Sequence, residues 1–121
     1  DCVIYGMQQY KPIKSIICPN GEYICSVVSF RLALFDAIIN GTHSRVLRVR
    51  SVEEGDLTTT NSTINCPIGM NSECYINADF SWRGFEFTVI NADYTQKLNM
   101  SGEGIGTFNH VTVNARYANS I

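Results

Sequence analysis

The segment from Gly84 to Gly102, GFEFTVINADYTQKLNMSG, decides the fold that we predict from this sequence. Apolar side chains alternate at Phe85, Phe87 and Val89, and every second side chain of a β-strand lies on the same face of a sheet. The turn-prone NAD that follows separates this strand from a second one at QKLNM. We therefore expect consecutive strands whose Phe85 face packs against another element of the domain.

The neighbouring sequence favours further strands and one helix. CYINADF lies before the segment and FNHVTVNARYA after it, and both are rich in strand-forming residues. Further upstream, VVSFRLALFDAII has apolar residues at helical spacing, which are Val28, Leu32, Phe35 and Ile39. We predict a mostly buried helix there, while the β-branched start at Val27 leaves a strand open. The predicted fold class is α+β, a single helix packed on a mainly antiparallel β-sheet.

Between this helix and the C-terminal strands lie an arginine-bearing strand and a long polar segment. SRVLRVRSVEE alternates imperfectly and predicts a half-exposed strand whose basic cluster is Arg45, Arg48 and Arg50. This cluster is either an ordinary solvated strand face or a contact for RNA or a protein partner. DLTTTNSTINCPIGMNSEC is rich in Thr, Asn and Ser without a sustained period, which predicts a long surface excursion over 56–74. We find no internal repeat.

Length and charge limit the classes of protein to be considered. The chain has 121 residues, which suits one domain over 1–121, and its net charge of −2 supplies no broad basic field for nucleic acid. Its apolar runs are too short to span a bilayer, so we expect no membrane segment. A chain that begins at Asp1 suggests a mature secreted product whose targeting segment has been removed. Glycosylation sequons agree with a secretory route and lie at Asn40, Asn61 and Asn99.

The five cysteines point to disulfides and to an oxidising compartment. The gaps PNGEYI and PIGMNSE are longer than those of zinc sites, and we expect neither a metal nor another cofactor. We favour a bond between Cys66 and Cys74, which closes a short loop containing Pro and Gly, and then a bond between Cys18 and Cys25. Cys2 is then left over, and other pairings stay open.

The GFEFTVINADYTQKLNMSG segment resembles the central hairpin of the small guanyl-preferring ribonucleases that fungi secrete. In that family a Gly-Phe-Asp-Phe-Ser-Val strand leads through a Tyr-rich turn into a strand that ends in Ser-Gly; the matching residues here are Gly84, Phe85, Phe87, Val89, Tyr94, Ser101 and Gly102. The next strand of the family is matched by Val111, Val113 and Asn114. Upstream, Tyr23-Ile24-Cys25 is similar to the Tyr-x-Cys element near the N-terminus of those enzymes.

The same elements describe the RNase-like secreted effectors of powdery mildew fungi, which this chain resembles more closely. The resemblance implies a microbial ribonuclease-like fold for the whole domain. One departure is that no cysteine follows Cys74, whereas these proteins commonly bond the Tyr-x-Cys cysteine to one near the C-terminus. The partner of Cys25 is therefore open on the family pattern.

The resemblance also assigns the catalytic positions of the family. Tyr75 matches an active-site tyrosine, but Asn77 stands in place of a histidine and Thr95 in place of the glutamate base. An amide and a hydroxyl cannot move a proton near neutral pH as an imidazole or a carboxylate does. His110 stands where an arginine clamps the phosphate. We therefore expect a pseudo-ribonuclease without catalytic activity, in which these four positions converge.

The function that the resemblance implies is that of a secreted fungal effector, a virulence or avirulence protein delivered into plant cells. Such a protein acts by binding host proteins, and a plant intracellular immune receptor of the leucine-rich-repeat class (NLR) can recognise it. Two alternatives stay open. A divergent secreted ribonuclease would use His110 and His43. An RNA-binding protein without cleavage would stack bases on Tyr75, Trp82 or Tyr94.

Overall fold

The computed structural model describes residues 2–5, 13–18, 24–29, 32–52, 56–78, 81–102 and 104–116. Within these ranges it contains thirteen β-strands and no helix, and thus no helix that could cross a membrane. The strands follow one another in five turns of the chain, which we call coils. The strands are, coil by coil, β1 (Cys2–Tyr5) and β2 (Ile13–Ile17); β3 (Ile24–Ser29) and β4 (Leu32–Asn40); β5 (Val46–Ser51), β6 (Leu57–Thr60) and β7 (Thr63–Asn65); β8 (Gly69–Asn77), β9 (Ser81–Glu86) and β10 (Val89–Asn91); and β11 (Thr95–Ser101), β12 (Gly104–Asn109) and β13 (Thr112–Asn114).

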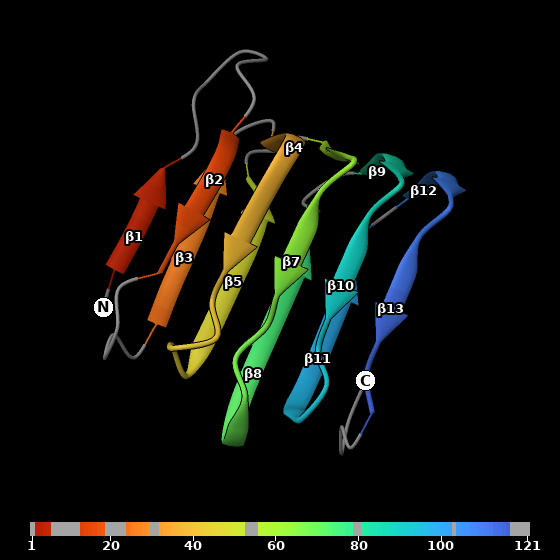
Figure 1. Cartoon of the computed structure of the whole chain (residues 1–121). Helices are drawn as coiled ribbons and strands as arrows, with labels where there is room; N and C mark the ends of the chain where they lie inside the picture. The colour runs from red at the N-terminus through yellow and green to blue at the C-terminus, as the bar shows by residue number, and fades with distance from the viewer. Residues whose placement is uncertain are drawn as a thin grey trace.

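Every strand pairing in the described ranges is parallel and joins strands of successive coils. Sheet A has the order β1-β3-β5-β8-β11, and the other eight strands form sheet B. Cys25 pairs with Leu47, 22 residues later, and Leu47 pairs with Cys74, 27 residues later. The chain thus returns to the same place once in each coil. The molecule is a parallel β-solenoid, and Figure 1 shows its strands stacked side by side from β1 at one end to β13 at the other.

Sheet B bends at a corner where one residue of each of the last four coils has a left-handed backbone. These residues have φ angles of 49° to 55° and are Asp36, Asn61, Phe87 and His110. The corner separates β6 from β7, β9 from β10 and β12 from β13, and it lies within β4. A single left-handed residue redirects a strand without lengthening the chain, and Asn and Asp adopt this conformation more readily than Phe. The last three coils therefore each place one strand in sheet A and two in sheet B.

The core lies between the two sheets and consists of stacked rows of apolar side chains, one residue from each coil. Three consecutive members of two of these rows are almost completely buried, with exposures of 0% or 1%; they are Leu47, Cys74 and Leu98 in sheet A, and Ile39, Ile64 and Ile90 in sheet B. Burying one Leu or Ile side chain contributes about 1.5–3 kcal/mol. Each coil is therefore stabilised mainly by the coils on either side of it.

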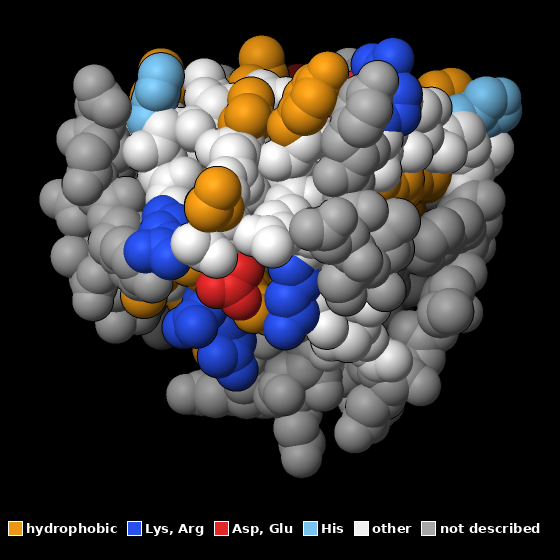
Figure 2. All heavy atoms as spheres, turned by 90° about the horizontal axis from the view of Figure 1, so that it is seen from below, with side chains coloured by type: hydrophobic (Ala, Val, Ile, Leu, Met, Phe, Trp, Pro, Cys, Tyr) orange, Lys and Arg blue, Asp and Glu red, His pale blue; other side chains and the backbone are white. Residues whose placement is uncertain are grey.

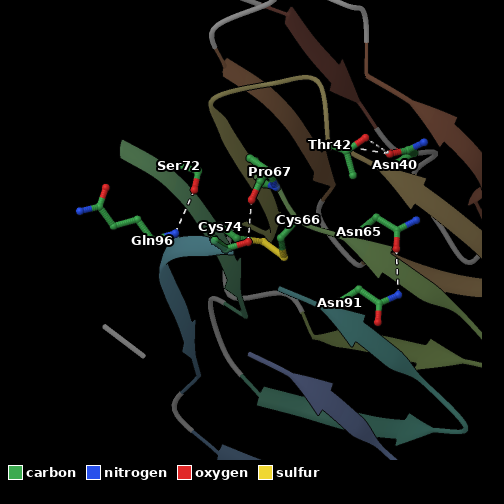
Figure 3. The surroundings of a disulfide bond; sticks show 10 residues. Asn40, Thr42, Asn65, Cys66, Pro67, Ser72, Cys74, Asn91 and Gln96 are labelled. Carbon is green, nitrogen blue, oxygen red and sulfur yellow. Dashed lines mark hydrogen bonds between the residues drawn. A yellow bond between two sulfur atoms is a disulfide. The ribbon is translucent and has the colours of Figure 1, made fainter. Parts of the chain in front are cut away.

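A ladder of asparagines runs along sheet B parallel to these rows. The strand register places Asn40, Asn65, Asn91 and Asn114 one above another. The Asn91 amide donates to Asn65 Oδ1 at 2.9 Å, and the Asn114 amide donates to Asn91 Oδ1 at 2.9 Å. Asn40 Oδ1 instead accepts from the Thr42 hydroxyl at 2.8 Å (Figure 3). The ladder thus adds side-chain hydrogen bonds between coils to those of the backbone.

Two disulfides join the end of one coil to the sheet A strand of the next coil. Cys18 is bonded to Cys25 and Cys66 to Cys74, with Cα–Cα distances of 5.9 Å and 5.6 Å (the second bond is shown in Figure 3). These are the two pairings that the spacing of the cysteines favours. All four residues are buried, and bonds of this kind agree with an oxidising compartment. Cys2 lies in β1, and its side chain is outside the described part of the structure.

The predicted helix is wrong, because VVSFRLALFDAII forms parts of β3 and β4. The side chains of β4 that face the core are Leu32, Leu34, Ala37 and Ile39. This is strand alternation whose phase shifts by one residue at left-handed Asp36. Phe35 and Ile38 are 44% and 50% exposed, so the helical stripe drawn through Phe35 does not lie on one face. The phase shift and the β-branched residues together imitate helical spacing.

The predicted antiparallel sheet is wrong as well. Alternation along one strand is the same in parallel and antiparallel sheets, and these strands pair one coil away instead of with their neighbour in sequence. Phe85 is buried in β9, whereas Phe87 is 54% exposed at the corner and Val89 belongs to β10. The three residues therefore do not share one face as predicted.

The predicted surface excursion over 56–74 contains β6, β7 and the first part of β8. Polar residues conceal its alternation, because some of their hydroxyls are satisfied inside the core. Thr59 is fully buried, and its hydroxyl lies 2.8 Å from that of Thr88. Ser62 is also buried and accepts a hydrogen bond from the Ala37 amide at 3.2 Å. The segment is an integral part of sheet B and sheet A.

Candidate functional site

Charged and polar side chains cover the outer face of β5, β8 and β11 in sheet A. Side chains alternate between the two faces along each strand. Leu47, Cys74 and Leu98 point into the core, so the residues next to them on their own strands point outward. The register aligns three rows across these strands: Val46, Glu73 and Lys97; Arg48, Tyr75 and Asn99; and Arg50, Asn77 and Ser101. Val46 is buried, and we call the other members of these rows the sheet A face. Parallel strands lie about 4.8 Å apart, so neighbours within a row can touch.

Tyr75 lies in the middle of the sheet A face, between two cations. The Arg48 guanidinium carbon is 5.6 Å from the centroid of the tyrosine ring, and Lys97 Nζ is 5.4 Å from it. Both distances fall within the range of cation–π interactions. The phenol hydroxyl donates a hydrogen bond to the Glu73 carboxylate. These contacts fix the ring and engage the acidic residue of the face.

Amide and hydroxyl groups form a connected cluster beside Tyr75. Asn77 Nδ2 lies 3.2 Å from Asn99 Oδ1 and 2.7 Å from Ser101 Oγ, and it donates to both. Arg50 precedes Asn77 in the same row. The cluster can both donate and accept hydrogen bonds, which suits a ligand that carries hydroxyl groups.

The sheet A face is positively charged overall, because Arg48, Arg50 and Lys97 outnumber Glu73. Arg48, Arg50 and Lys97 are exposed, so they can bind a ligand without rearranging the core. Figure 2 shows basic side chains gathered around an acidic one on one side of the molecule, while exposed apolar side chains line the opposite edge. A basic surface that contains an aromatic ring and amides can bind an anionic partner.

The four ribonuclease-like positions do not converge. Tyr75 and Asn77 lie together on the sheet A face, as described above. Thr95 is fully buried, and its hydroxyl donates to the Pro67 carbonyl at 2.6 Å. His110 lies at the corner of sheet B, where its ring stacks on Phe87 at a centroid distance of 4.8 Å. The arrangement that the resemblance implies for these residues is therefore wrong.

Other residues singled out from the sequence lie apart from one another. Arg45 is exposed in the turn before β5, whereas Arg48 and Arg50 point outward from β5 itself. His43 is exposed in the same turn. Tyr94 is 56% exposed in the turn before β11. Trp82 lies in β9, with its side chain outside the described part of the structure.

The three sequons differ in their surroundings. Asn61 is exposed at the corner of sheet B, where its amide donates to Asp36 Oδ1 at 2.7 Å. Asn99 is exposed on the sheet A face. Asn40 is partly buried at the start of the asparagine ladder. A glycan therefore has open space at Asn61 and Asn99, and glycosylation stays a prediction.

Sequence reasoning missed half of the sheet A face, namely Glu73, Lys97, Asn99 and Ser101. The sequence predicts Tyr75 as a ribonuclease position or a base-stacking residue, and Asn77 as a ribonuclease position. The signal that could have found the face is the alignment of LRVRS, CYIN and LNMS on their buried first residues Leu47, Cys74 and Leu98. In that alignment the outward residues fall at matching places in the three strands.

An ion pair outside this face joins Asp93, in the turn that precedes β11, to Arg116, in the turn that follows β13. Arg116 binds the Asp93 carboxylate through Nη2 at 2.7 Å and Nε at 3.2 Å, and its backbone amide donates to Oδ1 at 2.7 Å. The side-chain hydrogen bonds from Arg116, followed by its backbone amide, hold the pKa of Asp93 below its usual value. The same side-chain bonds raise the pKa of Arg116. This pair joins the last two coils.

The described residues contain no cluster of three His, Cys, Asp or Glu side chains that could hold a metal ion. Comparison of the chain with protein families, curated proteins and solved structures finds no match. The surface of the solenoid therefore supplies the observations that bear on function.

Proposed function

We propose that this protein is a secreted binding protein, not an enzyme, whose sheet A face binds an acidic polysaccharide. The observation that carries the proposal is the position of Tyr75 between Arg48 and Lys97. Around it the face combines charge, an aromatic ring and neutral hydrogen-bonding groups on one sheet surface. The cations and the neutral groups each correspond to one part of a uronic acid polymer.

The cations correspond to the carboxylates of such a polymer. Arg48 and Arg50 are two residues apart on one strand, which separates their Cα atoms by about 6.5 Å. Arginine binds a carboxylate through two parallel N–H groups. Two arginines on one strand can therefore each bind one carboxylate of the polymer in this way. Lys97 adds a third charge two strands away from β5.

The neutral groups correspond to sugar hydroxyls. Asn77 already donates hydrogen bonds to Asn99 and Ser101, so the three side chains are held in place before a ligand arrives. Tyr75 is partly exposed, and its ring contacts with Arg48 and Lys97 hold these two cations beside the neutral groups. A preorganised polar surface loses less conformational entropy on binding than a mobile one.

The sheet A face fits RNA less well than it fits an acidic polysaccharide. Single-stranded RNA is bound by stacking its bases on open aromatic faces along a strongly basic groove. Here Arg48 and Lys97 lie over the Tyr75 ring, and the net charge of the chain is −2. We therefore favour a carboxylated sugar polymer, and RNA binding is an outcome that the experiment distinguishes.

The effector role and an NLR receptor as partner stay predictions of the ribonuclease resemblance. The same resemblance implies an α+β fold, which the described residues contradict. A surface on a rigid scaffold can bind a protein as well as a polysaccharide. We favour a polysaccharide as the ligand because the sheet A face carries two amides and a hydroxyl that are joined by hydrogen bonds from Asn77 to Asn99 and Ser101.

The test is a set of binding titrations with polygalacturonate, neutral dextran and a guanosine-containing RNA oligonucleotide. We expect saturable, salt-sensitive binding of polygalacturonate and none of dextran. Arg48→Gln, Arg50→Gln and Lys97→Gln should each weaken binding about tenfold, which corresponds to about 1.4 kcal/mol for one charged hydrogen-bonded contact.

The matched control is Arg116→Gln, which removes one positive charge outside the sheet A face. It should leave binding unchanged if the face, and not the net charge, holds the ligand. Equal binding of polygalacturonate by the native protein and by a variant that combines Arg48→Gln, Arg50→Gln and Lys97→Gln would contradict the proposal. Tighter binding of RNA than of polygalacturonate would favour the RNA alternative, and RNA cleavage lost in His110→Ala would favour the ribonuclease.

A further inference from the structure

The two ends of the solenoid expose strand edges that match each other. β11, β12 and β13 are the last strands of their sheets, and within the described ranges their outer edges pair with no further strand. β1 and β2 are the first strands that the structure describes, at the opposite end, and their outer edges pair with no other described strand. Figure 1 shows these strands at opposite ends of the stack. An unpaired edge presents backbone donors and acceptors to any strand of suitable register.

In sheet B the core is partly exposed at its C-terminal end, whereas Leu98 in the last strand of sheet A is 1% exposed. Ile39, Ile64 and Ile90 are fully buried, whereas Val113, the next residue in their row, is 42% exposed. Val111 and Ala115 are also only partly buried against the core. Each earlier member of the row is covered by the following coil. Val113 therefore lacks the cover that the repeat provides everywhere else in this row.

One backbone hydrogen bond between successive coils recurs at the same position of sheet B. Cys18, Gly41, Cys66 and Ala92 each follow a strand of sheet B, and each donates its amide to the asparagine carbonyl of the next coil at 2.6–2.9 Å. Ala115 is the next residue in this series. Ile17 occupies the asparagine position of the first coil and is 73% exposed. The Ala115 amide and the Ile17 carbonyl are thus the donor and acceptor that one further step would join.

We propose that copies of this chain associate head to tail, the last coil of one copy pairing with the first coil of the next. In the continued register Asn114 faces Ile17, and Thr112 faces Ser15 of the neighbouring copy. The interface buries Val113 and extends both parallel sheets across the junction. Because the two surfaces differ, the contact does not close on itself and produces chains of copies. This inference does not depend on the ligand of the sheet A face.

Cysteine cross-linking tests the register directly. The strand register places Thr112 and Ser15 in the row of Ile38 and Val89, and adjacent parallel strands are about 4.8 Å apart, within the reach of a disulfide. In a Cys2→Ser background, Ser15→Cys and Thr112→Cys proteins are mixed and oxidised. We expect a cross-linked dimer that contains one of each variant, formed several-fold more than either homodimer.

The control mixture is Ser15→Cys with Ile68→Cys, because Ile68 is 57% exposed and lies before β8, away from both ends. It should give only the background of random collisions. A Thr112→Cys homodimer as the main product would mean tail-to-tail pairing and overturn the proposal. Equal yields from the test and control mixtures would overturn it as well.

Sedimentation velocity supplies a second measurement without engineered cysteines. The native chain should sediment as larger species at rising concentration, and Val113→Lys should remain monomeric because a charge then occupies the junction. Met70→Lys, at a position 87% exposed, adds the same charge elsewhere and should associate like the native chain. A native chain that stays monomeric at every concentration, or association unchanged in Val113→Lys, would contradict head-to-tail pairing.

Discussion

Asn91 illustrates how single side chains hold this fold together. Its amide donates to Asn65, and its carbonyl oxygen accepts from Asn114, so one side chain bonds the coils on both sides. An ionised aspartate in its place could accept the hydrogen bond from Asn114 but could not donate one to Asn65. The ladder fixes the register of three coils at one point.

Replacing Asn91 with alanine should destabilise the protein by about 1–3 kcal/mol, because Asn65 and Asn114 each lose a partly buried hydrogen-bond partner. The measurement is urea unfolding followed by circular dichroism. Asn99→Ala is the control, since Asn99 is exposed on a strand, and it should change stability by less than about 0.5 kcal/mol. Equal effects of the two substitutions would show that the ladder contributes no more than a surface amide.

At the scale of elements, the polar strands β6 and β7 show most clearly that composition can mislead. LTTTNSTIN looks like a surface loop, yet its side chains alternate between core and surface on both sides of Asn61. Leu57 and Ile64 are fully buried apolar members of this segment. Threonine is common in strands because its branched side chain fits a pleated surface.

This assignment predicts that Ile64→Ala destabilises the protein by about 2–5 kcal/mol, the usual cost of a large core truncation. Ile68 is the matched control, because the same substitution at this position, 57% exposed, should cost less than about 0.5 kcal/mol. Thermal and urea unfolding of the two variants provide the comparison. If 56–74 were a surface excursion, both substitutions would be nearly neutral.

Much of the strand content could be predicted from sequence, but the way the strands pair could not. Alternation predicts the strands around Val49, Ile76 and Leu98, and the cysteine spacing favours both disulfides. A parallel partner lies a whole coil away, so no local pattern identifies it. The recurring IIN, TIN, VIN and TVN that end at Asn40, Asn65, Asn91 and Asn114 carry the repeat, but they are too short to stand out in a search for long repeats.

Only part of the candidate site could be predicted from the sequence, because its strands also pair one coil away. Arg48 and Arg50 are predicted from the sequence as contact residues because they are basic and alternate along one strand. Lys97 and Glu73 became relevant only when the register placed their strands beside β5. A site spread over successive coils has no compact sequence motif, because its residues are separated by the full length of each coil.

At the scale of the whole molecule, the solenoid explains both the site and the open ends. Stacking equivalent strands aligns outward side chains into rows, which creates the sheet A face from residues far apart in the chain. The same stacking leaves an unpaired edge at each end within the described ranges. The proposed ligand and the proposed self-association therefore follow from one architecture and use different surfaces.

The register of sheet A is the most direct test of this account, and nuclear Overhauser contacts measured by NMR report it. We expect Hα-to-amide contacts that join Arg48 to the Tyr75 strand and Tyr75 to the Asn99 strand, without the short Hα-to-Hα contacts of antiparallel pairs. Hα-to-Hα contacts between the strands at 81–86 and 95–101, or helical contacts through 27–39, would contradict the solenoid.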